Sequence, residues 1–400
     1  MATFAKKSFD AAAYAASRPT YPPQLFTHVL STVPTLSSSR SPRTLLDLGA
    51  GPGLSTFDFS PFLDHPNARF DRVIGVDPSP NMVQTARKIL EEKRARGELG
   101  KAKEWRFEVG RSDKLDGVVE DASVDLAIAG QAAHWFDPVG TYRELARVLK
   151  PGGAFAFWGY GEFFFPNRPE LSTLIPPYSA GTLGPFWEQP GRSIVEALLT
   201  PFPFPSPLSS SPPSSSDTSS STPSGGTSQP PPPDPSQDPI SSTVSPAVSA
   251  AVSPSSSSYD PSSFQRLFFL RPGGTPPFSS PPPPSSSSSP TIPQIETHHD
   301  LLLTKQWNLA QLEAYLRTWS AAHSFNEAHL SPSTSVHTAG SNGSNGGAGH
   351  GEEGFEQGRL EEKKDCVSAF VGQLKRAGLK EDEEVLVAWE LGIMSGRKRE

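Results

Sequence analysis

The chain has 400 residues, a formal net charge of −7 and a single cysteine, Cys366. One cysteine cannot form an intrachain disulfide, so a disulfide-stabilised fold is excluded and a reducing compartment is expected. The mild acidity argues against a large nucleic-acid-binding surface, which needs an excess of basic residues to neutralise phosphates.

Composition divides the chain into four parts. From 201 to 263 serine and proline dominate. Such a segment buries too little apolar surface to offset backbone ordering, which costs about 1 to 2 kcal/mol per residue, so we predict a disordered insertion. The other parts are an N-terminal arm and helix over 1–43, a core over 44–200, and the rest of the same domain over 264–400, with further disorder at about 272–290 and 331–354.

In the first 160 residues, short apolar runs alternate with segments of helical periodicity, a pattern typical of β-α-β units around a mostly parallel sheet. Five strands are expected there and two more in the C-terminal part. They cover Thr44–Leu48, 72–76, 105–109, 123–129, 154–158, 264–270 and 385–389. The predicted fold class is therefore α/β, a Rossmann-like doubly wound sheet of seven mostly parallel strands.

Capping residues mark where the helices begin. Ser79 is expected to cap a helix that starts at Pro80, and Asp137 to cap one that ends before an LKPGG turn at 149–153. A third helix is expected over 309–325. Its packing face would hold Leu312, Leu316, Trp319 and His323.

A glycine-rich turn follows the first predicted strand. In the sequence LLDLGAGPG, Asp47 precedes three glycines at alternate positions, Gly49, Gly51 and Gly53. Glycines let the backbone turn tightly and approach a ligand, and free amides at the next helix start face a polar group. The spacing G-x-G-x-x-G of dinucleotide folds is not met, because Leu54 occupies its last position. This disfavours a nicotinamide oxidoreductase.

Carboxylates flank this turn. Asp47, two residues before the first glycine, suits a cationic or amine-bearing cofactor better than a phosphate. Asp77 lies at the tip of the second predicted strand, where a carboxylate can accept hydrogen bonds from both hydroxyls of a ribose. The glycine turn, the second-strand acid and the LKPGG turn, in this order and spacing, indicate a nucleoside-type cofactor site.

With these motifs the chain resembles the class I S-adenosylmethionine-dependent methyltransferases. The cofactor motifs are LLDLGAGPG, VIGVDPSPNMVQTAR and the LKPGG turn. More narrowly, the chain is similar to the fungal trans-aconitate methyltransferase-like group within the type 11 methyltransferase family. This closer resemblance is carried by SRPTYP, AAHWFD, FWGYG, LGPFWEQPGR, YLRTWSAAHSF and VAWELGIMSGRKR, and it skips only the low-complexity insertions.

The resemblance implies that S-adenosylmethionine is the cofactor. Ser112 and Asp113 would lie beside the adenine, although Arg111 stands where many members have an aspartate. Met82 would contact the adenine or else belong to the core of its helix. The methionine part would be surrounded by Asp47, Gly49, Gly51 and Gly53, and the ribose would be bound by Asp77.

The acceptor decides which side chains are needed. Methyl transfer from a sulfonium is an in-line displacement, so the protein mainly aligns the reactants. A carboxylate acceptor needs no base, whereas a hydroxyl usually does. We expect transfer to a carboxylate of a small, trans-aconitate-like organic acid, giving a methyl ester, with His134 and Trp135 shaping the pocket. The alternative is a hydroxyl of a secondary metabolite, with His134 as base.

Aromatic and cationic residues cluster at predicted strand ends and loops. Aromatic faces stabilise a sulfonium by ~0.5 to 2 kcal/mol each where water is excluded. An acid acceptor also needs a cation, and arginine forms bidentate pairs with carboxylates. The candidate substrate-binding residues are Arg18, Trp158, Tyr160, Trp187 and Arg192.

A non-catalytic alternative rests on the proline tracts. Tetraprolines near 230 and 281 suit SH3 or WW domains, because polyproline II is preformed there, and would make the chain a scaffold. No metal or nucleic-acid partner is expected. No membrane partner is expected either, since no apolar run reaches the ~18 to 20 residues of a membrane helix. The N-terminus lacks the apolar stretch of a secretion signal, so a cytoplasmic location is expected, with the nucleus as the alternative.

Overall fold

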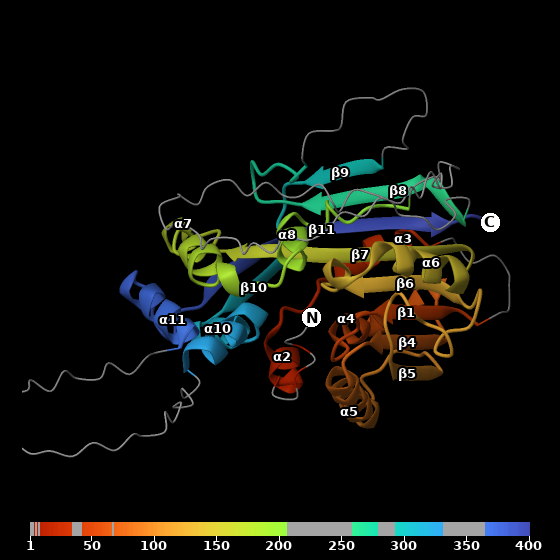
Figure 1. Ribbon diagram of the computed structural model, residues 1–400, viewed down its shortest axis with the longest axis horizontal. Helices are drawn as coiled ribbons and strands as arrows, with labels where there is room; N and C mark the ends of the chain where they lie inside the picture. Colours follow the sequence, from red (N-terminus) through yellow and green to blue (C-terminus); the bar gives the residue numbers. More distant parts are fainter. Residues whose placement is uncertain are drawn as a thin grey trace, which may run out of the picture.

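A nine-stranded sheet forms the centre of the computed structural model (Figure 1). The model describes residues 4, 6, 9–33, 42–65, 68–205, 258–278, 293–330 and 365–400. Within these residues the strands are ordered β5-β4-β1-β6-β7-β11-β8-β9, and β10 pairs with β11. Their bounds are β1 Thr44–Leu48, β4 Arg72–Asp77, β5 Glu104–Val109, β6 Val124–Gly130, β7 Leu149–Phe164, β8 Tyr259–Phe269, β9 Gln294–His298, β10 Leu303–Trp307 and β11 Val385–Lys398, besides a separate hairpin of β2 Asp64–His65 and β3 Ala68–Arg69.

The parallel half of the sheet contains β5, β4, β1, β6 and β7. The chain builds outward from β1 through β4 to β5 and then returns to the other side of β1 with β6. The strand order therefore reverses at β1. In open α/β sheets, ligands bind in the crevice beyond the carboxyl ends of the strands at such a reversal.

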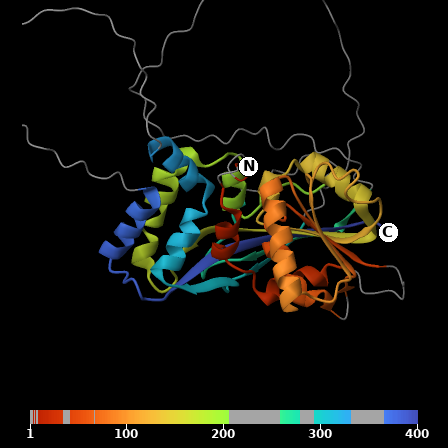
Figure 2. The same cartoon turned by 90° about the horizontal axis from the view of Figure 1, so that it is seen from below.

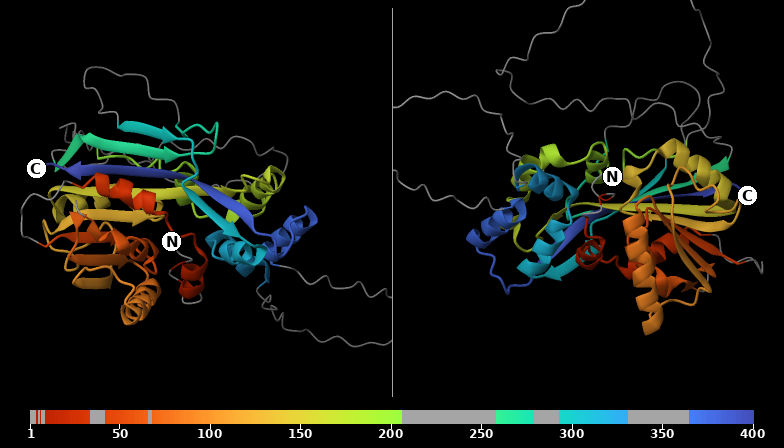
Figure 3. Two further views of the ribbon diagram at one scale, coloured as in Figure 1. Left: turned by 180° about the vertical axis from the view of Figure 1, so that it is seen from behind. Right: turned by 60° about the horizontal axis from the view of Figure 1, so that its bottom comes forward.

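Helices cover both faces of the parallel half, which confirms the α/β, Rossmann-like doubly wound fold. Buried residues of α3, α4 and α5 pack on one face, and those of α6 on the other. Figure 2 shows α5 lying across the sheet, and the left panel of Figure 3, seen from behind, shows α3 in front of the strands. The helices are α2 Ala11–Ser17, α3 Pro23–Ser31, α4 Leu54–Asp58, α5 Pro80–Arg96, α6 Pro138–Val148, α7 Pro169–Ser172, α8 Gly191–Glu196, α9 Leu309–Arg317, α10 Ser320–Leu330 and α11 Cys366–Arg376, with short turns η1 Ser60–Phe62, η2 Ala133–Trp135, η3 Pro177–Thr182 and η4 Gly184–Phe186.

The predicted capping residues are confirmed. Ser79 accepts a hydrogen bond from the N–H of Met82 at the start of α5, and Asp137 accepts from two N–H groups at the start of α6. The single helix predicted over 309–325 is wrong, because α9 ends at Arg317 and α10 begins at Ser320. The hydroxyl of Thr318, between them, bonds the carbonyl of Tyr315, so the chain turns there.

The strand predictions were incomplete. All seven predicted strands are present, but β9 and β10 were missed because QIETH and LTKQW alternate polar and apolar residues weakly. The predicted insertion over 201–263 is too long at both ends. β8 already begins at Tyr259, and Phe202 is buried with 1% of its surface exposed. The tract predicted at about 272–290 also begins too early, because residues up to Phe278 are placed and the ring of Phe278 packs on that of Phe268. The remainder of the predicted insertions, including the two tetraproline tracts, lies outside the described residues.

Two long strands, β7 and β11, run past the carboxyl edge of the parallel sheet and carry a helical cap (Figures 1 and 3). The cap consists of α7, α9, α10, α11 and the turns η3 and η4. Its core is aromatic: the ring of Phe163 on β7 meets those of Tyr315 and Trp319, and Tyr178 stacks on Phe370 at 4.2 Å. The space between the cap and the sheet edge holds the candidate site. Among the described residues, no helix is long and apolar enough to cross a membrane.

Candidate active site

The glycine turn after β1 adopts a backbone that only glycine takes without strain. Gly49, Gly51 and Gly53 have φ angles of 66°, 56° and 93°. A Cβ atom on Gly49 would lie 2.6 Å from the Cβ of Ala132, so the turn is pressed against the residues after β6. A Cβ on Gly51 would meet no atom within 4 Å. The backbone at Gly51 therefore faces open space.

Asp47 is wholly buried below this turn. Its Oδ2 accepts hydrogen bonds from the hydroxyls of Ser55 (2.7 Å) and Thr56 (2.6 Å) at the start of α4. Burial raises the pKa of Asp47 to about 7, although these hydrogen bonds act in the opposite direction. Asp47 lines none of the cavities described below, so its contacts hold α4 and the turn against β1.

Asp77, at the end of β4, connects the glycine turn to α5. Its Oδ2 accepts from the N–H of Gly51 at 2.9 Å, and its Oδ1 accepts from the N–H of Ser79 at 2.8 Å. Burial raises the pKa of this carboxyl, while the two N–H groups lower it. Each carboxylate oxygen can accept further hydrogen bonds, so Asp77 can still bind a ligand.

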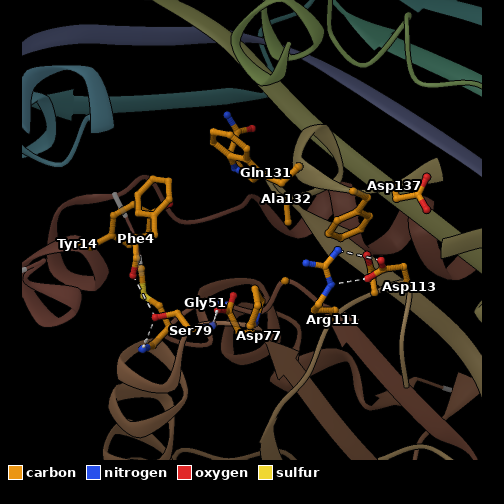
Figure 4. Close-up of a pocket in the computed structure, with 16 residues that line it drawn as sticks. Phe4, Tyr14, Gly51, Asp77, Ser79, Arg111, Asp113, Gln131, Ala132 and Asp137 are labelled. Carbon is orange, nitrogen blue, oxygen red and sulfur yellow. Dashed lines mark hydrogen bonds and ion pairs between the residues drawn. The ribbon is translucent and has the colours of Figure 1, made fainter. Parts of the chain in front are cut away.

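A first cavity, of about 340 Å³, opens above Gly51 and Asp77 (Figure 4). Figure 4 shows Phe4 and Tyr14 on one side of it and Arg111 with Asp113 on the other. Arg111 donates from Nε and Nη2 to the two oxygens of Asp113, at 2.8 and 2.9 Å. The arginine that departs from the family pattern is thus neutralised by the predicted adenine-side residue. Ser112 also lines the cavity, and its hydroxyl pairs with that of Thr141 at 2.9 Å.

The N-terminal segment, meaning the described residues up to Ser17, closes one wall of this cavity. The carbonyl of Phe4 accepts from the hydroxyl of Ser79 at 3.0 Å, and Asn81 donates to the carbonyl of Phe9 at 2.9 Å. Met82 packs against Phe9 and also lines the cavity, so both roles considered for it from sequence are compatible. The predictions did not include Phe4 or Tyr14, because no local pattern links them to the glycine turn.

A second, smaller cavity of about 90 Å³ lies under the cap. Four residues line both cavities: Phe4, Tyr14, Gln131 and Trp135. Of the predicted substrate residues, Arg18, Tyr160, Trp187 and Arg192 line the second cavity, as does His134. Trp158 lines none of these cavities; it is fully buried against Tyr21 and Phe26, so we leave it out of the acceptor site.

Arg18 follows α2 and reaches into the second cavity. It donates from Nη1 to the hydroxyl of Tyr160 and from Nη2 to the carbonyl of Thr318, both at 3.2 Å. Its guanidinium lies over the rings of Tyr14 and Tyr315, at 4.7 and 5.2 Å. These contacts are with neutral groups, and Nε has no hydrogen-bond partner in the described part of the chain. Arg18 is therefore a partly buried cation available to an anion.

Arg192, in contrast, already has acidic partners. Its Nε donates to Glu196 at 2.7 Å, its Nη2 donates to Glu162 at 2.8 Å, and its guanidinium lies 4.2 Å above the ring of Trp187. Trp187 in turn donates from Nε1 to the carbonyl of Ser179 at 2.9 Å. This network fixes the outer wall of the second cavity.

His134 and Trp135 form the turn η2 between the cavities, with ring centroids 4.8 Å apart. Burial, helped by the guanidinium groups of Arg18 and Arg192, lowers the pKa of His134 to about 3. Its Nδ1 is buried without a hydrogen-bond partner among the described residues. His134 is thus neutral at physiological pH and a weak base.

Gln131, after β6, was not predicted, yet it lies at the junction of the two cavities. Its φ is 53°, which is unusual for a residue with a side chain. The side chain accepts from the N–H of Tyr160 at 2.8 Å and donates to the carbonyl of the same residue at 3.1 Å. These bonds clamp the end of β6 to β7, and only the tertiary pairing reveals them.

The geometry fits S-adenosylmethionine. The first cavity combines an unfilled space above Gly51, a buried carboxylate with spare acceptor capacity and an apolar side chain, Met82. Comparison with known proteins agrees: residues 46–157 match the family model described as a methyltransferase domain. This stretch is a methyltransferase domain. The match supports S-adenosylmethionine as the cofactor of this stretch.

Relatives of the methyltransferase domain occur in several organisms. The probable S-adenosylmethionine-dependent methyltransferase CRG1 of Saccharomyces cerevisiae is 29% identical over 176 residues, 44% of this chain and 54% of that protein. The malonyl-[acyl-carrier protein] O-methyltransferase of Legionella pneumophila is 30% identical over 122 residues, 30% of this chain and 37% of that protein. The chain thus spans about half the length, or less, of these two relatives.

The fold outside the methyltransferase domain also has a counterpart. The structure of a putative type II methyltransferase from Anaeromyxobacter dehalogenans matches 95% of this chain and 97% of its own, with a TM-score of 0.50 and 19% identity. At this identity the likeness shows the fold and not the reaction.

Proposed function

We propose that the whole chain is an S-adenosylmethionine-dependent methyltransferase that acts on a carboxylate of a small organic acid and gives a methyl ester. The observation that carries this proposal is the contact between two cavities: one fits the cofactor, and the other presents Arg18 as an unneutralised cation. When bound, S-adenosylmethionine supplies a methyl group on a positively charged sulfur.

The chain's own residues would bind and align the reactants. We propose that Asp77 holds the ribose hydroxyls and that the backbone of Gly49 and Gly51 supports the methionine part. Ser112, Asp113 and Met82 also line the first cavity and would contact the adenine. Arg18 would hold the acceptor, while Trp135 and Tyr14, which line both cavities, would exclude water from their junction.

The low pKa of His134 favours an acid acceptor over a hydroxyl acceptor. A hydroxyl has to lose its proton, and a base is most effective when its pKa lies near the working pH. A base with a pKa of about 3 is far from that range. A carboxylate is already ionised and needs no base. The name of the Legionella relative, an O-methyltransferase, is consistent with transfer to oxygen.

The experiment is a search for methylated products. The purified full chain would be incubated with isotopically labelled S-adenosylmethionine and a metabolite extract, and mass spectrometry would record molecules that gain a labelled methyl group. We expect a labelled methyl ester that mild alkali hydrolyses. A labelled product that resists alkali would indicate the hydroxyl acceptor, and a lack of affinity for S-adenosylhomocysteine would refute the methyltransferase proposal itself.

A further inference from the structure

Three residues that line the second cavity each have a polar atom that is buried without a hydrogen-bond partner in the described part of the chain. These atoms are Arg18 Nε, His134 Nδ1 and Glu162 Oε1. A buried polar atom that loses water without gaining a partner costs about 1 to 3 kcal/mol. Three such atoms around one small space indicate that a polar ligand completes them.

Glu162 is the least expected of the three, because its carboxylate would repel the carboxylate of an acid acceptor. It lies near the end of β7, and its Oε2 accepts from Nη2 of Arg192 and from the hydroxyl of Ser179. Arg192 is held in turn by Glu196 and by the ring of Trp187. The network therefore fixes the Glu162 side chain, and its Oε1 stays without a partner on a residue that lines the cavity. An ionised carboxylate can only accept hydrogen bonds, so its ligand must be a donor.

The charges around the cavity also favour an acceptor with a single carboxylate. Its lining includes two arginines, Arg18 and Arg192, and two glutamates, Glu162 and Glu188. Since Arg192 is paired with carboxylates of the protein, Arg18 is the cation left to attract an acceptor. One carboxylate on the acceptor is thereby balanced. Further carboxylates, as in a tricarboxylate, would bring negative charge toward Glu162 in a partly buried site, which is unfavourable.

We propose that the acceptor carries, besides the carboxylate that faces Arg18, a hydroxyl or ammonium group that donates a hydrogen bond to Oε1 of Glu162. The acceptor is thus a small hydroxy acid or amino acid and not a polycarboxylate. Glu162 is then a specificity-determining residue of the site. This inference rests on the proposed function, and it replaces the trans-aconitate-like acceptor with one that has a donor group.

The test measures binding of matched acids to the full chain saturated with S-adenosylhomocysteine. One series is propionate, lactate and alanine; the other is butyrate, 3-hydroxybutyrate and 4-aminobutyrate; tricarballylate represents the polycarboxylates. We expect a hydroxy or amino member of at least one series to bind about tenfold or more tightly than its unsubstituted acid, and more tightly than tricarballylate. Tighter binding of the hydroxy acid would identify the donor group as a hydroxyl, and tighter binding of the amino acid would identify it as an ammonium group.

Two variants connect the preference to Glu162. Glu162→Gln removes the negative charge at nearly constant size and should reduce the preference at least about fivefold. The matched control is Glu196→Gln, which removes the other carboxylate of Arg192 but does not line the cavity; it should keep the preference. Both variants should bind S-adenosylhomocysteine as the wild type does.

Several outcomes would overturn the inference. They are equal binding of the unsubstituted acids in both series, tightest binding by tricarballylate, an unchanged preference in Glu162→Gln, or no binding of any donor-bearing acid up to about 10 mM. In each of these cases intact affinity for S-adenosylhomocysteine leaves the proposed function standing. Loss of that affinity in the wild type would instead refute the proposed function.

Discussion

The two cavities are built in different ways. The first is built around a backbone turn: Gly49 and Gly51, both with positive φ, and a carboxylate at the tip of the neighbouring strand that accepts from the N–H of Gly51. The second is formed mainly by side chains from α2, η2, β7, α8 and α9, which are distant in sequence. One contact there, from Arg18 to the carbonyl of Thr318, joins residues 300 apart. A backbone-built site constrains residue type at fixed spacing, whereas a side-chain pocket can change its ligand by single substitutions.

This difference predicts separable effects. Changes in the first cavity should reduce affinity for S-adenosylhomocysteine, and changes in the second should reduce only the use of the acceptor.

The largest effect is expected for Asp77→Asn. Hydrogen bonds to a charged group contribute about 1.5 to 3 kcal/mol each, so loss of the charge should weaken S-adenosylhomocysteine about 100-fold, measured by isothermal titration calorimetry. Glu108→Gln, at an exposed ion pair on the adjacent strand β5, is the control and should leave affinity unchanged. If Asp77→Asn weakens binding less than about threefold, Asp77 does not hold the cofactor.

The next effect compares two glycines of one turn. Gly51→Ala adds a methyl group that stands in open space, so it should fold with a strain of about 1 kcal/mol yet weaken S-adenosylhomocysteine more than about tenfold. Gly49→Ala presses on Ala132 and should lower the free energy of unfolding by about 1 to 3 kcal/mol. Chemical denaturation and calorimetry on both variants would check this. Normal binding by Gly51→Ala would place the cofactor elsewhere.

Arg18→Gln should raise the KM of the acceptor about tenfold and change affinity for S-adenosylhomocysteine by less than about twofold. Arg18→Lys should recover part of the loss, because it restores the charge but not the planar donor group. A different result would change the role assigned to Arg18. If Arg18→Gln weakens S-adenosylhomocysteine instead, the guanidinium serves the methionine carboxylate and the two cavities are not functionally separate.

A smaller effect is expected at His134. With a pKa of about 3 the imidazole is neutral at every pH above about 4, so it adds no rising limb to kcat between about pH 5.5 and 8. His134→Gln should lower kcat only a few-fold, as measured with the methyl-ester product. A loss of about 100-fold, or a rising limb that the substitution removes, would identify His134 as a base.

The smallest effect concerns the pH dependence of stability. The pKa of Asp47 is about 7 in the folded chain, above its unfolded value of about 3.9. The folded state therefore binds this proton more tightly, and the free energy of unfolding falls as the pH rises from about 4 to 7. Asp47→Asn cannot titrate and should show a flatter decline in thermal unfolding across that range. Parallel curves for the two proteins would contradict the raised pKa.

The sequence predicts features that have local signals and misses those that depend on contacts between distant residues. The strands and capping residues of the parallel half could be predicted because their signals are local: apolar runs, Ser79 before Pro80, and Asp137 before Pro138. The polar strands β9 and β10 carry no such signal, and the break between α9 and α10 depends on a turn at Thr318 that helical periodicity does not register.

The site residues also fall into those that the sequence reveals and those that it does not. The glycine turn and Asp77 could be found because their chemistry needs particular residues at particular spacing. Gln131 and Glu162 could not, since their roles arise from pairing with β7 and with Arg192. Trp158 shows the opposite error: an aromatic residue at a strand end suggested a pocket, but the face of the strand on which it lies belongs to the core.

The N-terminal segment forms a wall that the two cavities share. Phe4 and Tyr14 wall both cavities, and the chain that carries them is hydrogen-bonded to the start of α5 through Ser79 and Asn81. On the proposed function, a displacement of this segment that releases the demethylated cofactor would also open the second cavity. Turnover should accordingly follow a compulsory sequence, with one reactant always entering first, and product-inhibition patterns in the steady state would reveal it.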